Sequence, residues 1–265
     1  MNICCIYLTN TDKTDFNYKR ILNDAKTSVN HKIDVYKYVK CFDNNDLCYN
    51  IKNEKNIEFS FKYLQEKFKY NISYNNKESN AGKISGLEFL TVLDIYLKYT
   101  NKYDFYIYFE DDISFLTDKN IFDNFIYKEA FFYKLITEDL FTINNELINY
   151  PFGWPWLHEL KNLKNIYKQN YRHTLLCLYG LRTHIIENFL NYILEGNYGY
   201  HELLIPSFVY QFVDNKSDIV LLTDMFKCNI TWLYDEKLMY NNICDIMHPV
   251  KKYSLYKSLK EKYNN

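Results

Sequence analysis

The sequence lacks an imbalance of charge. Its 32 Lys and Arg residues are matched by 33 Asp and Glu residues, which leaves a formal net charge of −1. No overall field favours nucleic acid or an anionic membrane, so we expect neither as a partner. Arginine is also scarce, since it occurs only at positions 20, 172 and 182. Together with abundant Asn, Ile and Tyr, this bias indicates an AT-rich genome and does not specify chemistry.

Long apolar runs are missing as well. No stretch approaches the roughly 20 apolar residues that a helix needs to cross a bilayer, so no transmembrane segment is expected. The N-terminus has no basic region followed by an apolar run and a small-residue cleavage site, so no signal peptide is expected. We therefore predict a soluble protein of the cytoplasm, or of the host cytoplasm if the source is a virus.

The seven cysteines include no Cys-x-x-Cys pair. Their odd number and scattered positions predict neither a zinc site nor a disulfide framework. Free cysteine is among the most buried residue types in folded proteins. We therefore expect reduced, mostly buried thiols.

Hydrophobic residues are plentiful, at 48% of the chain with 19% aromatic, which is typical of a folded globular protein. Short apolar runs at 2–8 and 32–39 predict strands, while 57–68 and 82–99 carry apolar residues at helical spacing. Another strand is expected at 105–109. This alternation predicts an α/β fold, with a mostly parallel, Rossmann-like sheet flanked by helices in a single domain.

The second half of the chain gives weaker signals. Apolar runs predict strands at 174–179, 218–222 and 230–234, with a helix from about Thr183. The segment 253–265 is expected to pack as a closing helix rather than to contact a membrane.

The strongest signal for chemistry is the run of three carboxylates at Glu110, Asp111 and Asp112, directly after the strand at 105–109. Five apolar or aromatic residues in a row predict a strand buried on both faces. The carboxylates cannot share that interior, because desolvation and mutual repulsion would be severe. They must emerge at the carboxyl edge of the sheet, where open α/β sheets bind ligands. A solvated acidic turn is the alternative to a site for Mn²⁺ or Mg²⁺, which prefer oxygen ligands.

A second candidate is His248, which precedes Pro249 near the C-terminus. Proline keeps the preceding residue extended, so this histidine has limited backbone freedom. His248 could complete the coordination of the metal, and Lys251 could meet a diphosphate as a point charge. The alternative is a surface histidine beside solvated lysines.

His201 and Glu202 come directly before an apolar run. Burial there would raise the pKa of a carboxylic acid, so Glu202 is a candidate general base for an acceptor hydroxyl, with His201 as the substitute. The alternative is an acidic residue placed at a helix N-terminus by the helix dipole.

Trp154 and Trp156 flank Pro155 in an aromatic loop. Flat aromatic faces pack against sugar rings, so both are candidate residues for binding an acceptor. The alternative is that they cap a hydrophobic core.

The segment 103–115, with sequence YDFYIYFEDDISF, resembles glycosyltransferases of the GT-A fold. It is most similar to the lipopolysaccharide-type enzymes (family 25 and related viral and bacterial sequences). The resemblance extends to 82–86, 177–181, 201–206 and 248–251. It departs at Ser85-Gly86, where the family has a serine-histidine pair.

The resemblance implies a GT-A-like fold that binds a nucleotide-sugar donor beneath the first strands. Asp112 would bind the metal, with Glu110 or Asp111 directed towards the ribose or base. His248 stands where a further, C-terminal metal ligand is expected. Thr9 and Asn10, at the tip of the first strand, would lie beside the nucleotide.

We therefore predict a metal-dependent glycosyltransferase of the hexosyltransferase type, which moves a sugar from a nucleotide-diphosphate donor to a glycan or other hydroxyl acceptor. The metal would be held by Asp112, Glu110 and His248, and Lys83 or Lys251 would counter phosphate charge. Residues 1–116 form the expected donor half, 117–252 the acceptor half, and 253–265 a tail.

Two alternatives remain open. A metal-dependent nucleotidyl or phosphodiester transferase would need a second acidic group, for which Asp224 and Asp235 are candidates. A non-catalytic carbohydrate-binding protein on a degenerate transferase fold would bind sugar without a cation.

Overall fold

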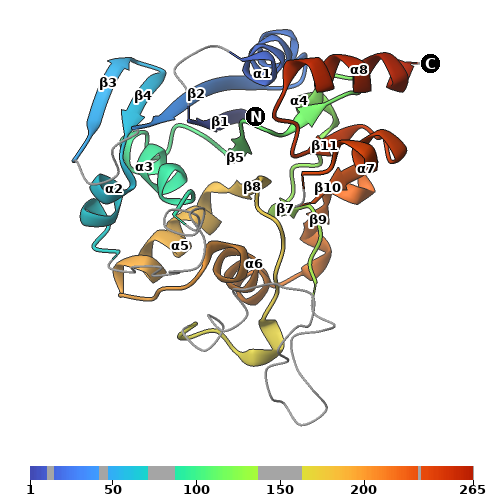
Figure 1. Ribbon diagram of the computed structural model, residues 1–265. Helices are drawn as coiled ribbons and strands as arrows, with labels where there is room; N and C mark the ends of the chain where they lie inside the picture. The colour runs from blue at the N-terminus through green and yellow to red at the C-terminus, as the bar shows by residue number, and fades with distance from the viewer. Residues whose placement is uncertain (11–14, 42–46, 71–86, 137–162, 232–233, 265) are drawn as a thin grey trace.

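The computed structural model describes residues 1–10, 15–41, 47–70, 87–136, 163–231 and 234–264. Its centre is an eight-stranded sheet in the order β3-β4-β2-β1-β5-β8-β7-β9 (Figure 1). The neighbours from β4 through β2 and β1 to β5 are parallel, while β3, β8 and β7 each have an antiparallel partner. The strands are β1 (Asn2–Thr9), β2 (Lys32–Lys40), β3 (Tyr49–Asn53), β4 (Asn56–Phe59), β5 (Phe105–Glu110), β7 (Ala130–Phe132), β8 (Leu178–Arg182) and β9 (Ile219–Leu221).

Strand β5 lies inside this sheet and separates two hydrophobic cores. It pairs with β1 on one side, where Leu8 is opposite Glu110, and with β8 on the other. Tyr106 and Tyr108 point into one core, and the alternate residues of the strand point into the other. The expected interior strand with an acidic end is therefore confirmed.

Helices cover both faces of the sheet, as the α/β prediction requires. The first core lies under α2 (Phe61–Lys67), α3 (Leu90–Lys98), α5 (Thr183–Leu194) and α6 (His201–Phe212). The second core lies under α1 (Phe16–Thr27) and α4 (Ile121–Asn124). Short 3-10 turns occur at η2 (Lys168–Asn170), η3 (Lys216–Asp218) and η4 (Leu222–Asp224). None of the helices in the described ranges is long and apolar enough to cross a membrane.

A second sheet of three short strands lies beside the carboxyl end of β5 (Figure 1). It contains β10 (Cys228–Ile230), β11 (Ile246–His248) and β6 (Ser114–Phe115), in that order. The last two helices, α7 (Glu236–Asn241) and α8 (Tyr253–Asn264), pack on it through a small core that includes Met239, Leu255 and Leu259. The expected packing of the C-terminal segment as a helix is confirmed.

Several expected boundaries are wrong. Residues 57–68 are not one helix, because Ile57 and Phe59 belong to β4 and the helix begins only at Phe61. The break comes at Ser60, whose side chain accepts a hydrogen bond from the Tyr63 amide and caps the helix. In the described part of 82–99, helix α3 begins only at Leu90. Likewise β8 begins at residue 178 rather than 174, and β10 ends where the strand 230–234 was expected to start.

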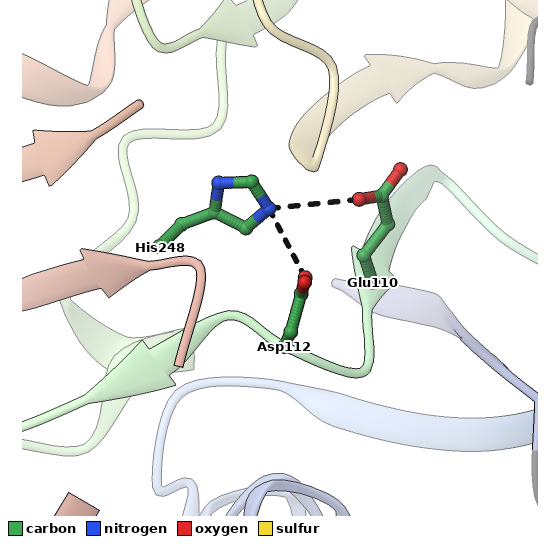
Figure 2. Close-up of side chains that lie close together, drawn as sticks. All are labelled: Glu110, Asp112 and His248. Atoms are coloured by element: carbon green, nitrogen blue, oxygen red, sulfur yellow. Dashed lines mark ion pairs between the residues drawn. The ribbon is translucent and has the colours of Figure 1, made fainter. Parts of the chain in front are cut away.

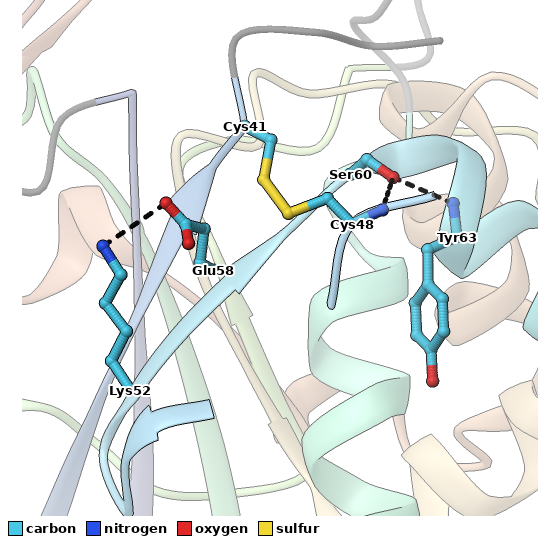
Figure 3. Close-up of a disulfide and its surroundings, with 6 residues drawn as sticks. All are labelled: Cys41, Cys48, Lys52, Glu58, Ser60 and Tyr63. Carbon is cyan, nitrogen blue, oxygen red and sulfur yellow. Dashed lines mark hydrogen bonds and ion pairs between the residues drawn. A yellow bond between two sulfur atoms is a disulfide. The ribbon is translucent and has the colours of Figure 1, made fainter. Parts of the chain in front are cut away.

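The expectation that every cysteine is reduced is also wrong. Cys41, directly after β2, and Cys48, directly before β3, form a disulfide (Figure 3). Ser60 accepts a hydrogen bond from the Cys48 amide at 3.2 Å, which ties this linkage to the start of α2. Cys4, Cys5 and Cys177 are free and buried, as expected. Disulfides persist mainly in oxidising compartments, so this bond does not itself support the predicted cytoplasmic location.

Candidate metal centre

The three carboxylates emerge at the carboxyl edge of the sheet, and they diverge there. Glu110 is the last residue of β5, and its amide donates to the Cys177 carbonyl at 2.9 Å, which holds the strand end against the neighbouring segment. The chain then turns, so that Glu110 and Asp112 face His248 (Figure 2). Asp111 instead faces the end of β1. Two of the three acids, Glu110 and Asp112, therefore lie beside His248, while Asp111 lies beside β1.

His248 comes from the second sheet and meets two of these carboxylates. Its Nε2 lies 3.0 Å from Asp112 Oδ1 and 3.7 Å from Glu110 Oε2. Its Nδ1 lies 2.8 Å from the Thr231 carbonyl oxygen, which can only accept a hydrogen bond. Nδ1 therefore carries a proton, and Nε2 is the nitrogen left for the carboxylates or for a metal. Strand β11 is fixed in turn by the Val250 amide, which donates to the Asp112 carbonyl at 2.7 Å.

The electrostatics of this group depend on the imidazole. Burial raises the pKa of Glu110, and the nearby charge of Asp112 adds to that effect. Burial also acts to raise the pKa of Asp112, but the bond to His248 outweighs it and leaves the pKa below its usual value. For His248, burial disfavours the charged form, yet the bonds to Asp112 and Glu110 raise its pKa to about 10. Without a metal, the cluster is therefore stabilised by an imidazolium ion.

The donor set fits a divalent cation. Glu110, Asp112 and His248 each offer one ligand atom, these atoms lie within 4.8 Å of one another, and no second such group occurs in the described ranges. Asp112 Oδ1 is buried and, apart from its ion pair with His248, has no hydrogen-bond partner among the residues described. Carboxylate oxygens with one imidazole nitrogen suit Mn²⁺ better than Ca²⁺. Lys251, whose Nζ lies 3.8 Å from Asp112 Oδ2, stands beside the group.

Asp111 is fixed by the first strand. Thr9 Oγ1 donates to its carboxylate at 2.9 Å, and the Asn10 amide donates to the same oxygen at 3.3 Å. The Asn17 side chain donates to its carbonyl at 2.8 Å. Burial raises the pKa of Asp111, although the hydrogen bond from Thr9 opposes this. The structure thus brings together the three residues expected beside a nucleotide, while their contact with one stays a prediction.

His201 and Glu202 form the first turn of α6, so the helix-terminus interpretation of Glu202 describes its position correctly. Burial raises the pKa of Glu202 to about 8, and the charges of Glu110 and Glu88 contribute. A carboxyl group with this pKa exchanges protons near neutral pH, as the general-base prediction requires. His201 Nε2 lies 3.8 Å from Glu88 Oε2, and burial lowers the pKa of this histidine.

Two residues near the group were missed in the sequence. Glu88 lies just before α3 and faces His201, and Lys40 is the last residue of β2. The Lys40 ammonium lies 5.0 Å from the centre of the Phe61 ring. Because Val39 of β2 pairs with Thr9 at the end of the parallel strand β1, Lys40 lies at the same edge of the sheet. Burial lowers the pKa of Lys40, while the charges of Glu88 and Asp111 act to raise it. The available signal was position, since Lys40 directly follows the strand predicted at 32–39.

Three predicted residues cannot be placed. Lys83, Trp154 and Trp156 lie outside the described residues, and their roles stay predictions. The two acids considered for a second metal do not join the group. Asp224 lies on η4, and Asp235 caps α7 by accepting a hydrogen bond from the Leu238 amide at 3.0 Å.

No protein-family model matches the chain, and no curated protein is significantly similar to it. The family resemblance of the segment 103–115 therefore stays a resemblance.

The first prediction concerns metal binding. We expect Mn²⁺ to bind the purified protein with one-to-one stoichiometry, and His248→Ala to weaken binding at least tenfold because it removes the only nitrogen ligand of the group. Isothermal titration calorimetry measures both. The matched control is His184→Ala, which removes an exposed histidine that lies at the start of α5 and is paired with Glu129. Equal affinities for the wild type and His248→Ala would contradict the assignment.

The second prediction concerns Glu202. The pKa of Glu202 is raised in the folded state, so the unfolded chain releases this proton at lower pH than the folded chain does. The contribution of Glu202 to the free energy of unfolding therefore falls as the pH rises from about 4.5 to about 8. Glu202→Gln should remove roughly 2 to 4 kcal/mol of that fall, as measured by urea unfolding at pH 5 and pH 9 with EDTA present. The control is Glu261→Gln, on the exposed side of α8. A wild-type pH dependence in Glu202→Gln would show that Glu202 titrates normally.

Proposed function

We propose that the protein is a metal-dependent glycosyltransferase with a GT-A-like fold, which moves a sugar from a nucleotide-diphosphate donor to a hydroxyl acceptor. The observation that carries this proposal is the convergence of Glu110, Asp112 and His248 at the end of an interior strand. Open α/β sheets bind ligands at this edge. The resemblance of the segment 103–115 supports the choice of reaction.

Mn²⁺ or Mg²⁺ held by these three residues would neutralise negative charge on the leaving diphosphate. The protein's own cations would assist. Lys251 lies within 4 Å of Asp112, and its exposed ammonium is free to meet a phosphate oxygen. Lys40 brings a second ammonium to this edge, where the charges of Asp111 and Glu88 act on it. The predicted role of Lys83 stays a prediction. Thr9 and Asn10 hold Asp111 beside the place proposed for the nucleotide.

Glu202 is the proposed general base for an inverting reaction. Its raised pKa keeps the carboxyl partly protonated near neutral pH, so the deprotonated form is basic enough to take a proton from an acceptor hydroxyl. In a retaining reaction this step would not be needed, and Glu202 would only shape the acceptor side. The acceptor half 117–252 contains Glu202, while the donor half 1–116 contains the carboxylate edge.

The two alternatives differ in what they need. A nucleotidyl or phosphodiester transferase with two metals needs a second acidic group, and the described residues provide one group only. A carbohydrate-binding protein needs no cation. The triad of two carboxylates and an imidazole favours the transferase over both.

The third prediction tests this function. With a panel of nucleotide sugars, we expect Mn²⁺-dependent release of the nucleotide diphosphate from at least one donor, and Asp112→Asn should lower that rate at least 100-fold. Asp118→Asn changes an exposed carboxylate that is close to Asp112 in the sequence and paired with Lys260, so this variant should retain the rate. Circular dichroism confirms that both variants fold.

The outcomes separate the alternatives. Thermal stabilisation by a sugar that is equal with and without Mn²⁺ would favour the carbohydrate-binding protein, because a ligand that binds only the folded state stabilises it by mass action. Donor turnover that survives Asp112→Asn would contradict the metal centre. In an inverting reaction, Glu202→Gln should stop sugar transfer while Mn²⁺-dependent donor binding persists.

A further inference from the structure

A cavity of about 570 Å³ lies among the C-terminal elements, at the start of strand β11. This places it at the opposite end of the strand from His248. Its wall combines four segments: the turn before α4, the turn before β10, the end of α7 with the following loop, and the last turn of α8. The lining residues are Lys119, Lys227, Tyr240, Asn241, Ile243, Cys244, Asp245, Lys262 and Tyr263.

The charge of this cavity is positive. Lys119, Lys227 and Lys262 line it, and none of them forms an ion pair with a carboxylate among the described residues. Lys262 Nζ donates to the Tyr240 carbonyl at 2.7 Å and lies 5.1 Å from the centre of the Tyr240 ring, so its charge is positioned but not neutralised. Three lysines therefore line one cavity.

Asp245 is the one acidic side chain among the described residues of the wall, and it does not cancel these charges. Asp245 accepts the Lys227 backbone amide at 2.8 Å through one oxygen and the Tyr263 hydroxyl at 2.5 Å through the other. The Asp245 carbonyl also accepts the Leu116 amide at 2.8 Å. Asp245 thus links the loop after α7 to the turn before β10, to the last turn of α8 and to the chain just before the turn that precedes α4. Both of its carboxylate oxygens accept hydrogen bonds within this region. Hydrogen bonds between these segments therefore hold the wall of the cavity in place.

We propose that this cavity binds a small anion that carries two or more phosphate groups. Lysine ammonium groups are strongly hydrated point charges that suit phosphate oxygens. A volume of about 570 Å³ falls within the range of small-molecule sites and holds a diphosphate or a nucleoside diphosphate. Tyr240 and Tyr263 also line the wall, and aromatic rings are suited to packing against a base or sugar. Exposed lysines make the attraction sensitive to salt.

Lysine labelling read by mass spectrometry tests this site directly. The protein is treated with an amine-reactive acetylating reagent in EDTA, with inorganic pyrophosphate in one arm and a nucleoside diphosphate in the other. We expect labelling of Lys119, Lys227 and Lys262 to slow at least threefold, with one shared midpoint. Lys257, an exposed lysine of α8 outside the wall, should label at an unchanged rate. Protection by pyrophosphate identifies the phosphates as sufficient, and protection by the nucleoside diphosphate alone identifies a nucleotide; either result supports the site.

Variants separate this site from the metal centre. Lys227→Glu should abolish protection of Lys119 and Lys262, whereas Lys257→Glu should retain it. Asp112→Asn should also retain full protection, because the cavity and the carboxylate edge are distinct. Thermal unfolding confirms that each variant folds. Protection that is absent in both arms, extends equally to Lys257, survives Lys227→Glu or disappears in Asp112→Asn would overturn the proposal.

Discussion

The site depends on one electrostatic constraint: Glu110 and Asp112 are held close together at the end of a buried strand and need positive charge beside them. Strand β5 cannot shift to move these carboxylates apart, because its other side chains fill the cores on both faces of the sheet. The positive charge comes from His248 on a different sheet, 3.0 Å from Asp112. A proton on the imidazole meets this need in the metal-free protein, and a divalent cation would also supply positive charge there. The same geometry therefore stabilises the folded chain and forms a candidate cation site.

The surrounding structure keeps that geometry in place. The small sheet joins β6, which follows the carboxylates, directly to β11, which ends at His248. The Val250 amide donates a hydrogen bond to the Asp112 carbonyl, and the Thr231 carbonyl accepts one from the His248 imidazole. Backbone groups therefore fix the positions of Asp112 and His248. Such outer contacts preserve ligand orientation when a metal binds. On the other side of β5, Thr9 and Asn17 hold Asp111 away from the cluster. These contacts divide three consecutive acids into one pair and one separate residue.

Local sequence patterns predicted those site residues whose position follows from the segment that contains them. An all-apolar run before three acids is enough to place Glu110 and Asp112 at a sheet edge, and proline after His248 marks an extended residue. Local patterns failed to predict contacts between segments that are distant in the sequence. Lys40 lies where β2 ends at this sheet edge, and Glu88 lies just before α3, facing His201. The position of Lys40 directly after a predicted strand was a signal, whereas no local pattern indicates Glu88. The Cys41–Cys48 bond depends on the approach of β2 and β3. The boundary at Ser60 was missed because apolar residues at 57–68 fit a helix as well as a strand followed by a helix.

The most direct test of this account is a crystal structure of the protein soaked in Mn²⁺, with anomalous diffraction recorded at the manganese edge. The account predicts one strong anomalous peak in contact with Glu110, Asp112 and the Nε2 atom of His248, with the Nδ1 bond to Thr231 retained. A map with no peak between these three side chains, or with manganese bound only elsewhere on the protein, would contradict the claim that the carboxylate edge is a cation site.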